Sequence, residues 1–200
     1  GEIDKQEVRR LAHELKLPVA DKKDSTGICF IGERDFKKFL QNYIPAQPGK
    51  MVDIETGDVI GDHSGIMYYT IGQRKGLGIG GPGAAWFVVG KDYDKNVLYI
   101  CQGDQKDWLY SSGALITDVN WIASNKPTEK INCNAKFRYR QMDNPIQLEF
   151  VDEKTVYLTF DKPVKAVTPG QAAVFYDGDV CLGGGTIDTV YKDGEPIKYL

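Results

Sequence analysis

The sequence lacks the features of a membrane or secreted protein. No run of about 18 apolar residues occurs among its 200 residues, so no helix is predicted to cross a bilayer. Its first residues, Gly1 to Asp4, are polar, include no initiator methionine and do not resemble a signal peptide. Because a predicted helix begins directly after them, we expect the chain to be a piece of a longer protein.

Cysteine and histidine are scarce and isolated. None of the four cysteines belongs to a C-x-x-C pair, which argues against a zinc or thioredoxin-like site. Four cysteines in 200 residues are too few for a disulfide scaffold, so a reducing cytoplasm fits best. The two histidines, His13 and His63, have no acidic or cysteine partner at ligand spacing. We therefore predict no metal site and no Ser-His-Asp triad.

Basic residues are slightly outnumbered by acidic ones, and they are unevenly spread along the chain. The net charge of −3 argues against a broad electrostatic coating of nucleic acid. Residues 126–140 nevertheless contain five basic residues and one acid, whereas residues 141–200 contain ten acids and five lysines. Such a basic strip suits a protein that meets an anionic ligand at one place. The alternative is a solvated charged face.

Apolar periodicity and turn signals predict a mainly β protein with a short helical lead. Residues 4–17 and about 33–43 carry apolar side chains at helical spacing. Many short strands with tight turns follow from residue 51, a pattern typical of small antiparallel barrels. Three glycines at 183–185 indicate a bulge or barrel corner, and the polar stretch 102–113 is interpreted as a linker.

We expect the chain to have three parts. Residues 1–33 are predicted to be the tail of a domain whose body lies outside the chain, and they include the loop around Cys29. Residues 34–108 are predicted to form a small β-rich, barrel-like central domain. Residues 109–200 are predicted to form a C-terminal antiparallel β-barrel.

Cys29 is the best candidate nucleophile. It lies in a loop shortly before the second predicted helix, with lysines nearby at 22 and 23. Helix N-termini and cations stabilise the thiolate, which is the reactive form of cysteine. The alternative is a buried structural cysteine between two apolar neighbours. Cys101 and Cys181 lie within apolar strand patterns and are expected to be structural.

A glycine-rich stretch could meet a nucleic-acid backbone. Residues 72–83 hold six glycines together with Arg74 and Lys75. The stretch lacks the G-x-x-x-x-G-K-[ST] phosphate-loop pattern and a following helix. Its glycines still allow close approach to phosphates, and the alternative is an ordinary surface loop.

A second stretch, residues 137–141, interleaves aromatic and cationic side chains. On a strand, Arg138 and Arg140 would share one face, while Phe137 and Tyr139 would share the other. Arginine can pair with phosphate, and tyrosine can stack on a base. The alternative is an amphipathic strand with its apolar side turned inward.

Six stretches together resemble the tRNA-specific 2-thiouridylase (tRNA-uridine 2-sulfurtransferase) family. Their order and spacing agree along nearly the whole chain, and the combination is specific although each stretch alone is weak. The stretches are KDSTGICFIG at 23–32, PAQPG at 45–49, TIGQRKGLG at 70–78, RYRQ at 138–141, AVTPGQAAVFY at 166–176 and CLGGG at 181–185.

The resemblance implies an ATP-dependent transferase that acts on tRNA. In that family an N-terminal ATP-pyrophosphatase domain adenylates the C2 oxygen of the wobble uridine, and a cysteine persulfide then supplies sulfur. Cys29 matches the position of the persulfide cysteine. Three residues match positions used in tRNA contact: Arg138, Tyr139 and Gln171. Further candidates for tRNA contact are Arg74, Lys75 and Arg140.

The resemblance also implies partners and absences. The expected partners are tRNAs for Lys, Glu and Gln, and a sulfur donor that is either a cysteine desulfurase or a relay protein. The family's S-G-G-x-D-S ATP-binding loop is absent from this sequence, so we expect ATP to be bound by the N-terminal domain and not by this chain. The second catalytic cysteine, which releases sulfide or forms a disulfide with the first, is expected in that domain as well. The isolated chain should be inactive and bind tRNA weakly.

Two other functions stay open on the residues alone. One is a stand-alone RNA-binding β-barrel in which Cys29 is structural, and the other is a β-barrel that binds another protein. The feature that favours an enzyme is the Cys29 loop attached to a helical lead too short to form its own core. A pure binding module has no need of that segment.

Overall fold

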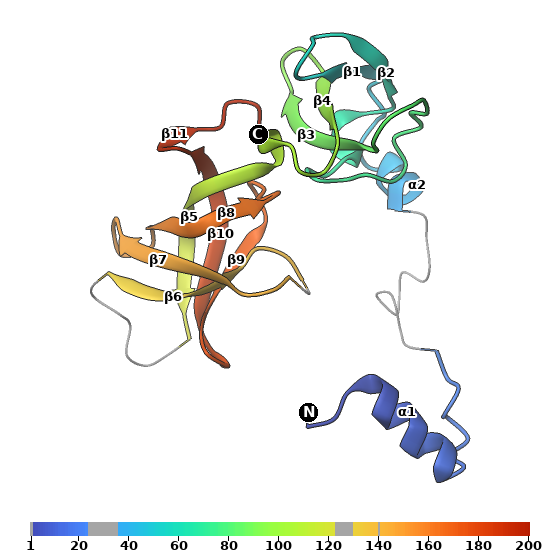
Figure 1. Cartoon of the computed structure of the whole chain (residues 1–200), viewed down its shortest axis with the longest axis vertical. Helices are drawn as coiled ribbons and strands as arrows, with labels where there is room; N and C mark the ends of the chain where they lie inside the picture. Colours follow the sequence, from blue (N-terminus) through green and yellow to red (C-terminus); the bar gives the residue numbers. More distant parts are fainter. Residues whose placement is uncertain (1, 24–35, 123–129, 140) are drawn as a thin grey trace. The chain divides into compact units, whose positions relative to one another are not determined.

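The computed structural model describes residues 2–23, 36–122, 130–139 and 141–200. The chain divides into two compact units, residues 1–45 and 46–200 (Figure 1). None of the described helices is long and apolar enough to cross a membrane.

The first unit contains the two predicted helices, α1 (Lys5–Glu14) and α2 (Phe36–Gln41). The Asp4 side chain caps α1 by accepting a hydrogen bond from the Glu7 amide at 2.8 Å, as the capping-box pattern predicts. Arg10 forms ion pairs with Glu7 on the preceding turn and Glu14 on the next turn. None of the α1 residues is buried, so its apolar stripe has no core within the described part of this unit.

The second unit begins with a four-stranded sheet of order β2-β1-β4-β3. Its two hairpins are antiparallel, but β1 and β4 pair in parallel. The expectation of purely antiparallel pairing is therefore wrong for this sheet, because the two hairpins join through strands that run in the same direction. The strands are β1 (Gly49–Asp53), β2 (Val59–His63), β3 (Trp86–Asp92) and β4 (Val97–Gln102).

A buried histidine ties the ends of this sheet together. His63 is 1% exposed, and its Nε2 lies 3.1 Å from the Asn96 carbonyl oxygen in the β3–β4 turn. The Gly65 amide donates to His63 Nδ1 at 3.1 Å. Burial lowers the pKa of the imidazole, which is consistent with a neutral ring that donates at Nε2 and accepts at Nδ1. His63 thereby fixes the start of the long segment that leads to the glycine-rich loop.

The rest of the second unit is an antiparallel barrel. Its strand order is β11-β10-β5-β8-β7-β6-β9, and an additional β10–β9 pairing closes six of these strands into a ring. The prediction of a mainly β protein with a C-terminal antiparallel barrel is confirmed. The strands are β5 (Tyr110–Trp121), β6 (Ile131–Lys136), β7 (Asn144–Phe150), β8 (Val156–Lys165), β9 (Ala172–Asp177), β10 (Val180–Lys192) and β11 (Glu195–Pro196).

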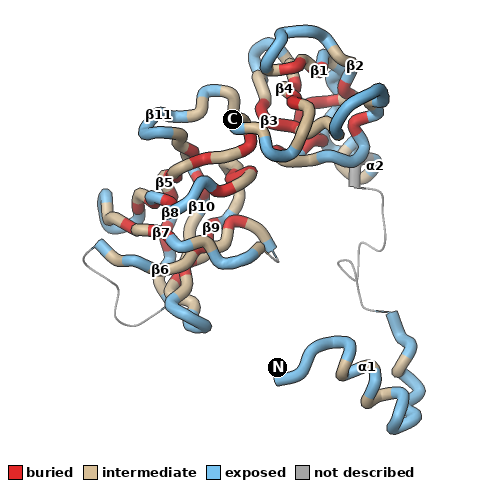
Figure 2. The backbone as a smooth tube through the Cα atoms, viewed as in Figure 1, coloured by how far each residue is buried: buried red, intermediate tan, exposed pale blue. Residues whose placement is uncertain are grey.

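Three glycines allow β10 to close the barrel, as predicted. The register shifts between Cys181 and Gly183 on the β9 side, and between Gly184 and Thr186 on the β5 side. A Cβ atom on Gly184 would lie 2.5 Å from the Ala173 carbonyl oxygen, so neighbouring backbone leaves no room for a side chain there. Figure 2 shows the buried residues that alternate along the barrel strands. Among them are Ile116, Leu148, Leu158 and Phe175.

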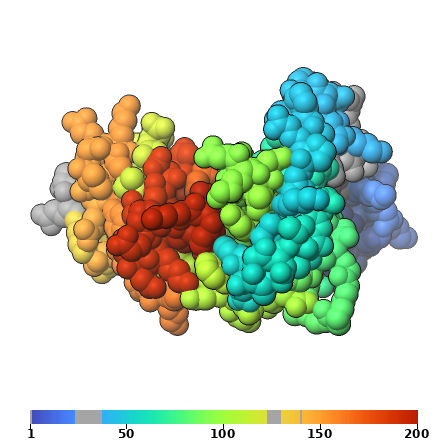
Figure 3. Space-filling view, turned by 90° about the horizontal axis from the view of Figure 1, so that it is seen from above, coloured from blue at the N-terminus to red at the C-terminus, as the bar shows by residue number. Residues whose placement is uncertain are grey.

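The stretch 102–113 is ordered rather than a linker. It contains a 3₁₀ turn at Asp107–Leu109 and the start of β5. Leu109 is buried, and the buried Ser111 hydroxyl donates to the Val164 carbonyl at 3.2 Å. The end of the chain also packs on this side of the unit, where the Lys91 amide donates to the Tyr199 carbonyl at 2.7 Å. Figure 3 shows the red C-terminal residues against the green residues of the four-stranded sheet.

Candidate nucleic-acid interface

A groove of about 760 Å³ lies on the barrel surface. Three of the predicted tRNA-contacting residues, Arg138, Tyr139 and Gln171, line it together. We call this surface the barrel groove. Its remaining lining residues are Lys136, Phe137, Ala172, Val174 and Tyr176.

Strand pairing explains why residues more than thirty positions apart meet in the barrel groove. β6 runs antiparallel to β9, with Lys136 opposite Val174 and Asn134 opposite Tyr176. The residues that follow β6 therefore lie beside those that precede β9. Lys136 and Tyr176, which the sequence analysis did not single out, belong to the groove for the same reason. Only the pairing register identifies them.

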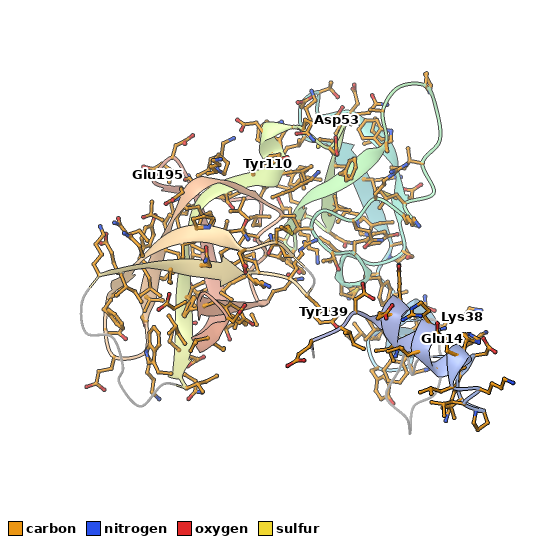
Figure 4. The ribbon with its side chains drawn as sticks, turned by 60° about the horizontal axis from the view of Figure 1, so that its bottom comes forward. Glu14, Lys38, Asp53, Tyr110, Tyr139 and Glu195 are labelled. Carbon is orange, nitrogen blue, oxygen red and sulfur yellow. The ribbon has the colours of Figure 1, made fainter. Side chains whose placement is uncertain are left out.

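Tyr139 projects from the turn that follows β6, and its side chain is 91% exposed (Figure 4). Phe137, two residues earlier, is 2% exposed. The predicted alternation, with both aromatic side chains on one face, is wrong, because β6 ends at Lys136 and the chain turns. Gln141 holds this turn through its side-chain oxygen, which accepts from the Phe137 amide at 2.8 Å. The turn thus buries one aromatic ring and presents the next to solvent.

A second exposed apolar side chain follows Tyr139 on the same turn. Met142 is 84% exposed, and the sequence analysis did not single it out. An exposed, polarisable thioether can contact the face of a planar base. Arg140 lies outside the described residues, so its predicted role in tRNA contact stays a prediction.

Arg138 turns its guanidinium toward protein carbonyls. Its Nη2 donates to the Ile71 carbonyl at 2.6 Å and to the Ala166 carbonyl at 2.9 Å. Nη2 also lies 3.4 Å from the Thr168 hydroxyl. The Nε atom is buried without a hydrogen-bond partner, and burial lowers the pKa of the group. Arg138 therefore links the loop before the glycine-rich stretch to the barrel.

Gln171 enters the barrel groove from a backbone that is fixed on both sides. The Ile187 amide donates to the Gln171 carbonyl at 2.8 Å, and the Gly170 amide donates to the Ile187 carbonyl at 2.8 Å. These bonds tie the segment before β9 to β10, which forms the wall of the barrel. The half-buried Gln171 is thereby placed at the groove. Its side chain carries both a hydrogen-bond donor, the amide NH₂, and an acceptor, the carbonyl oxygen.

The predicted basic strip is partly neutralised by ion pairs. Lys130 pairs with Glu149, and Lys136 lies 3.3 Å from an Asp143 oxygen. Lys136 also lies 5.4 Å from the centre of the Tyr176 ring, within the range of a cation–π contact. Among its described residues, the barrel groove therefore combines aromatic surface with cations that already have partners.

The glycine-rich loop, residues 72–83, presents the other predicted cations. Arg74 and Lys75 are both exposed. Gln73 folds this part of the chain into a turn, because its side chain accepts from the Thr70 amide at 3.0 Å and donates to the Lys75 carbonyl at 2.9 Å. A separate hollow of about 410 Å³ is lined by Arg74 and by the glycines that follow.

Two of the three described cysteines have surroundings that disfavour the reactive thiolate. Cys101 is fully buried in β4, and Cys133 is half-buried in β6. Burial raises the pKa of each thiol to about 11, so both are protonated at neutral pH. Cys101, Cys133 and Cys181 are free thiols within the described chain. Cys29 itself, the predicted persulfide carrier, lies outside the described residues. Among those that are described, no three His, Cys, Asp or Glu side chains form a group that could hold a metal ion.

Three family models match successive parts of the chain. Residues 1–33 match a "tRNA methyl transferase HUP domain", and residues 37–102 match a "tRNA methyl transferase PRC-barrel domain". Residues 111–187 match an "Aminomethyltransferase beta-barrel domain". The second and third of these correspond to the four-stranded sheet with its loops and to the closed barrel.

Proteins named tRNA-specific 2-thiouridylase MnmA are similar to the whole chain. The protein from Bacillus cytotoxicus is 56% identical over 200 residues, and that from Oceanobacillus iheyensis is 55% identical over the same length. The protein from Geobacillus thermodenitrificans is 56% identical. Each match covers 100% of this chain and 54% of the relative. The chain therefore spans about half the length of the curated relatives it matches.

Proposed function

Because the chain belongs to the tRNA-specific 2-thiouridylase family, we propose that it is part of a transferase that replaces the C2 oxygen of the wobble uridine of tRNA with sulfur. In this proposal the chain contributes a surface that holds tRNA and the cysteine that carries sulfur. The observation that carries the binding role is the barrel groove, where Arg138, Tyr139 and Gln171 meet. The proposal includes the division of the chain into three parts, residues 1–33, 34–108 and 109–200.

Cys29 is the sulfur carrier in this proposal. The terminal sulfur of a persulfide on Cys29 attacks C2 of the activated uridine. The C2–O bond breaks, and the oxygen leaves with the electron pair of that bond on the group that had activated it. A thiolate from outside this chain then attacks the Cys29 sulfur and forms a disulfide with it. The electron pair of the broken persulfide bond stays on the transferred sulfur, which remains on C2. Supporting this assignment, Cys101 and Cys133 are poor nucleophiles because burial raises the pKa of each thiol to about 11.

ATP would supply the activation of the C2 oxygen when it is bound elsewhere in the protein. The described residues of this chain do not fit an ATP-binding loop. The glycine-rich loop has no phosphate-loop pattern, and it leads into strand β3 at Trp86 instead of a helix. In this proposal no residue of this chain binds ATP.

Two surfaces hold tRNA in this proposal. Tyr139 stacks on an unpaired base beside the barrel groove, and Gln171 hydrogen-bonds to a base edge or sugar. Arg74 and Lys75 meet backbone phosphates from the glycine-rich loop. The resemblance to the family implies tRNAs for Lys, Glu and Gln as substrates, and a cysteine desulfurase or a relay protein as the sulfur donor. A reducing cytoplasm suits a reaction that passes through a persulfide.

A binding titration tests the tRNA-binding role. The chain is titrated with a tRNA that carries a wobble uridine, at about 0.05 M and about 0.2 M salt, because phosphate contacts weaken with salt. We expect salt-sensitive binding that Gln171→Ala weakens. Gln105→Ala is the matched control, since Gln105 is an exposed glutamine outside the groove. Absence of binding at the lower salt concentration would refute a tRNA-binding role for this chain.

A sulfur-transfer assay tests the role of Cys29. The chain is incubated with a cysteine desulfurase and free cysteine, and the position of any added sulfur atom is determined by peptide mass spectrometry. We expect the extra sulfur on the Cys29 peptide and none in a Cys29→Ser variant, with Cys181→Ser as the control that keeps it. Sulfur found equally on all cysteines would instead favour an RNA-binding barrel in which Cys29 is structural.

A further inference from the structure

The guanidinium of Arg138 joins two loops that are distant in sequence. Its Nη2 donates to the carbonyl of Ile71, 67 residues away, and to the carbonyl of Ala166, 28 residues away. Its Nε atom is buried with no partner. A backbone phosphate cannot take the Nη2 hydrogens without displacing these two carbonyls. This geometry makes Arg138 a clamp between the barrel and the segment that begins the glycine-rich loop.

Gly72 lies directly beneath this clamp. Its φ of +80° belongs to the left-handed region, and a Cβ atom there would lie 2.8 Å from the Cβ of Ala166 and 3.5 Å from Nη1 of Arg138. The loop can therefore approach the barrel only because position 72 has no side chain. The Gly72 amide donates to the Val88 carbonyl at 2.7 Å, which ties the same point to strand β3.

Gln73 connects the clamped segment to the exposed cations that follow it. Its side chain bonds to the Thr70 amide and to the Lys75 carbonyl, at 3.0 and 2.9 Å. The backbone of Gln73 also donates to the Thr70 carbonyl at 2.9 Å. Residues 70–75 thus form one hydrogen-bonded turn, with Arg74 and Lys75 on its outside. These bonds fix the backbone from which the side chains of Arg74 and Lys75 extend.

We propose that Arg138 is a positioning residue for tRNA binding, which clamps the turn at residues 70–75 against the barrel so that Arg74 acts together with the barrel groove. The inference rests on the proposed tRNA-binding function and adds that the Nη2 atom of Arg138 contributes through the loop, because its hydrogens are given to the carbonyls of Ile71 and Ala166. Arg74 then strengthens binding only while the clamp is intact. The barrel groove and the glycine-rich loop work as one composite surface.

A double-mutant experiment on tRNA binding tests the coupling. In the wild-type chain, Arg74→Ala should lower the slope of log affinity against log salt by about one, as expected when a cation on a phosphate is lost. In an Arg138→Ala background, Arg74→Ala should change the slope little. Equal effects of Arg74→Ala in both backgrounds would overturn the inference.

A glycine variant separates the clamp from the charge of Arg138. Gly72→Ala keeps every cation but forces the loop away from Ala166, so it should abolish the contribution of Arg74 in the same way. Gly78→Ala is the matched control, because Gly78 has a similar φ of +72° but no atom within 4 Å of its Cβ position. If Arg74 keeps its full effect in Gly72→Ala, the clamp is not what positions it.

Hydrogen exchange without RNA separates this inference from the proposed function. The Gly72 and Gln73 amides should exchange faster in Arg138→Ala than in the wild-type chain. The Ile54 amide, bonded to the Ile100 carbonyl within the sheet, should keep its rate and show that the fold is intact. Unchanged exchange at residues 72 and 73 would refute the clamp. A wild-type chain that binds no tRNA would refute the proposed function, while the exchange rates would still decide whether Arg138 holds the loop.

Discussion

Replacing Tyr139 with alanine should weaken tRNA binding without destabilising the barrel. The Tyr139 side chain is 91% exposed, and it follows the last residue of β6 by three positions. An exposed side chain beyond the end of a strand contributes little to the folded state, so the free energy of unfolding should change by less than about 0.5 kcal/mol. Stability and binding can therefore be separated at this position.

The size of the binding loss follows from the exposed ring. Stacking of one base on an aromatic side chain is worth about 1–3 kcal/mol by alanine substitution, which corresponds to about a 5-fold to about a 150-fold increase in Kd. Tyr139→Phe should keep most of the affinity, because stacking uses the ring face and does not need the hydroxyl group. The loss should also differ little between salt concentrations, since no phosphate contact is removed.

The assay is a fluorescence titration with a tRNA that carries a wobble uridine, alongside urea unfolding of the same variants. Tyr93→Ala is the matched control, because Tyr93 is 66% exposed but lies on the β3–β4 turn away from the barrel groove. A stacking role for Tyr139 is refuted if Tyr139→Ala binds as tightly as the wild-type chain. It is equally refuted if Tyr93→Ala loses as much affinity as Tyr139→Ala.

Three further predictions concern stability and thiol chemistry. Because burial lowers the pKa of His63 from its usual 6.5, the unfolded chain takes up a proton before the folded chain does. Stability should therefore fall as pH drops below about 6.5 and level off below the folded pKa, and urea unfolding should show a smaller acid loss in His63→Gln. Phe175→Ala removes a fully buried ring that lies 5.8 Å from the Trp121 ring. It should cost about 3–5 kcal/mol in chemical denaturation, against less than about 0.5 kcal/mol for the exposed Val180→Ala. With a pKa of about 11, roughly one Cys133 thiol in ten thousand is ionised at pH 7. An alkylating reagent should therefore label Cys133 far more slowly than it labels free cysteine, and rapid labelling would contradict this.

The sequence alone determined the class of structure and some of its local features. The apolar spacing within residues 4–17 predicted α1, because an amphipathic face depends on residues three or four positions apart. The glycines at 183–185 predicted the irregularity in β10, since only glycine fits where neighbouring backbone comes within 2.5 Å of a Cβ position. Signals of this kind are local, so they can be recognised without knowing which strands are neighbours.

Pairing between distant strands was decided only by the tertiary structure. The parallel contact of β1 with β4 brings together hairpins separated by a long segment, and no local pattern encodes it. The barrel groove depends on the pairing of β6 with β9, which sets Lys136 opposite Val174. The sequence named Arg138 and Tyr139 through their interleaved cations and aromatic rings, and it named Gln171 only through a family resemblance. That the three meet in one groove requires the barrel to close.

The orientation of individual side chains was also a tertiary outcome. Alternation along an assumed strand grouped Phe137 with Tyr139, but the strand ends first and the two rings have opposite environments. The composition of the same stretch suggested that Arg138 faces an anionic ligand, yet its Nη2 atom donates to the carbonyls of Ile71 and Ala166. A sequence shows which side chains carry charge. Whether a protein carbonyl or the solvent meets that charge depends on which backbone the fold brings beside it.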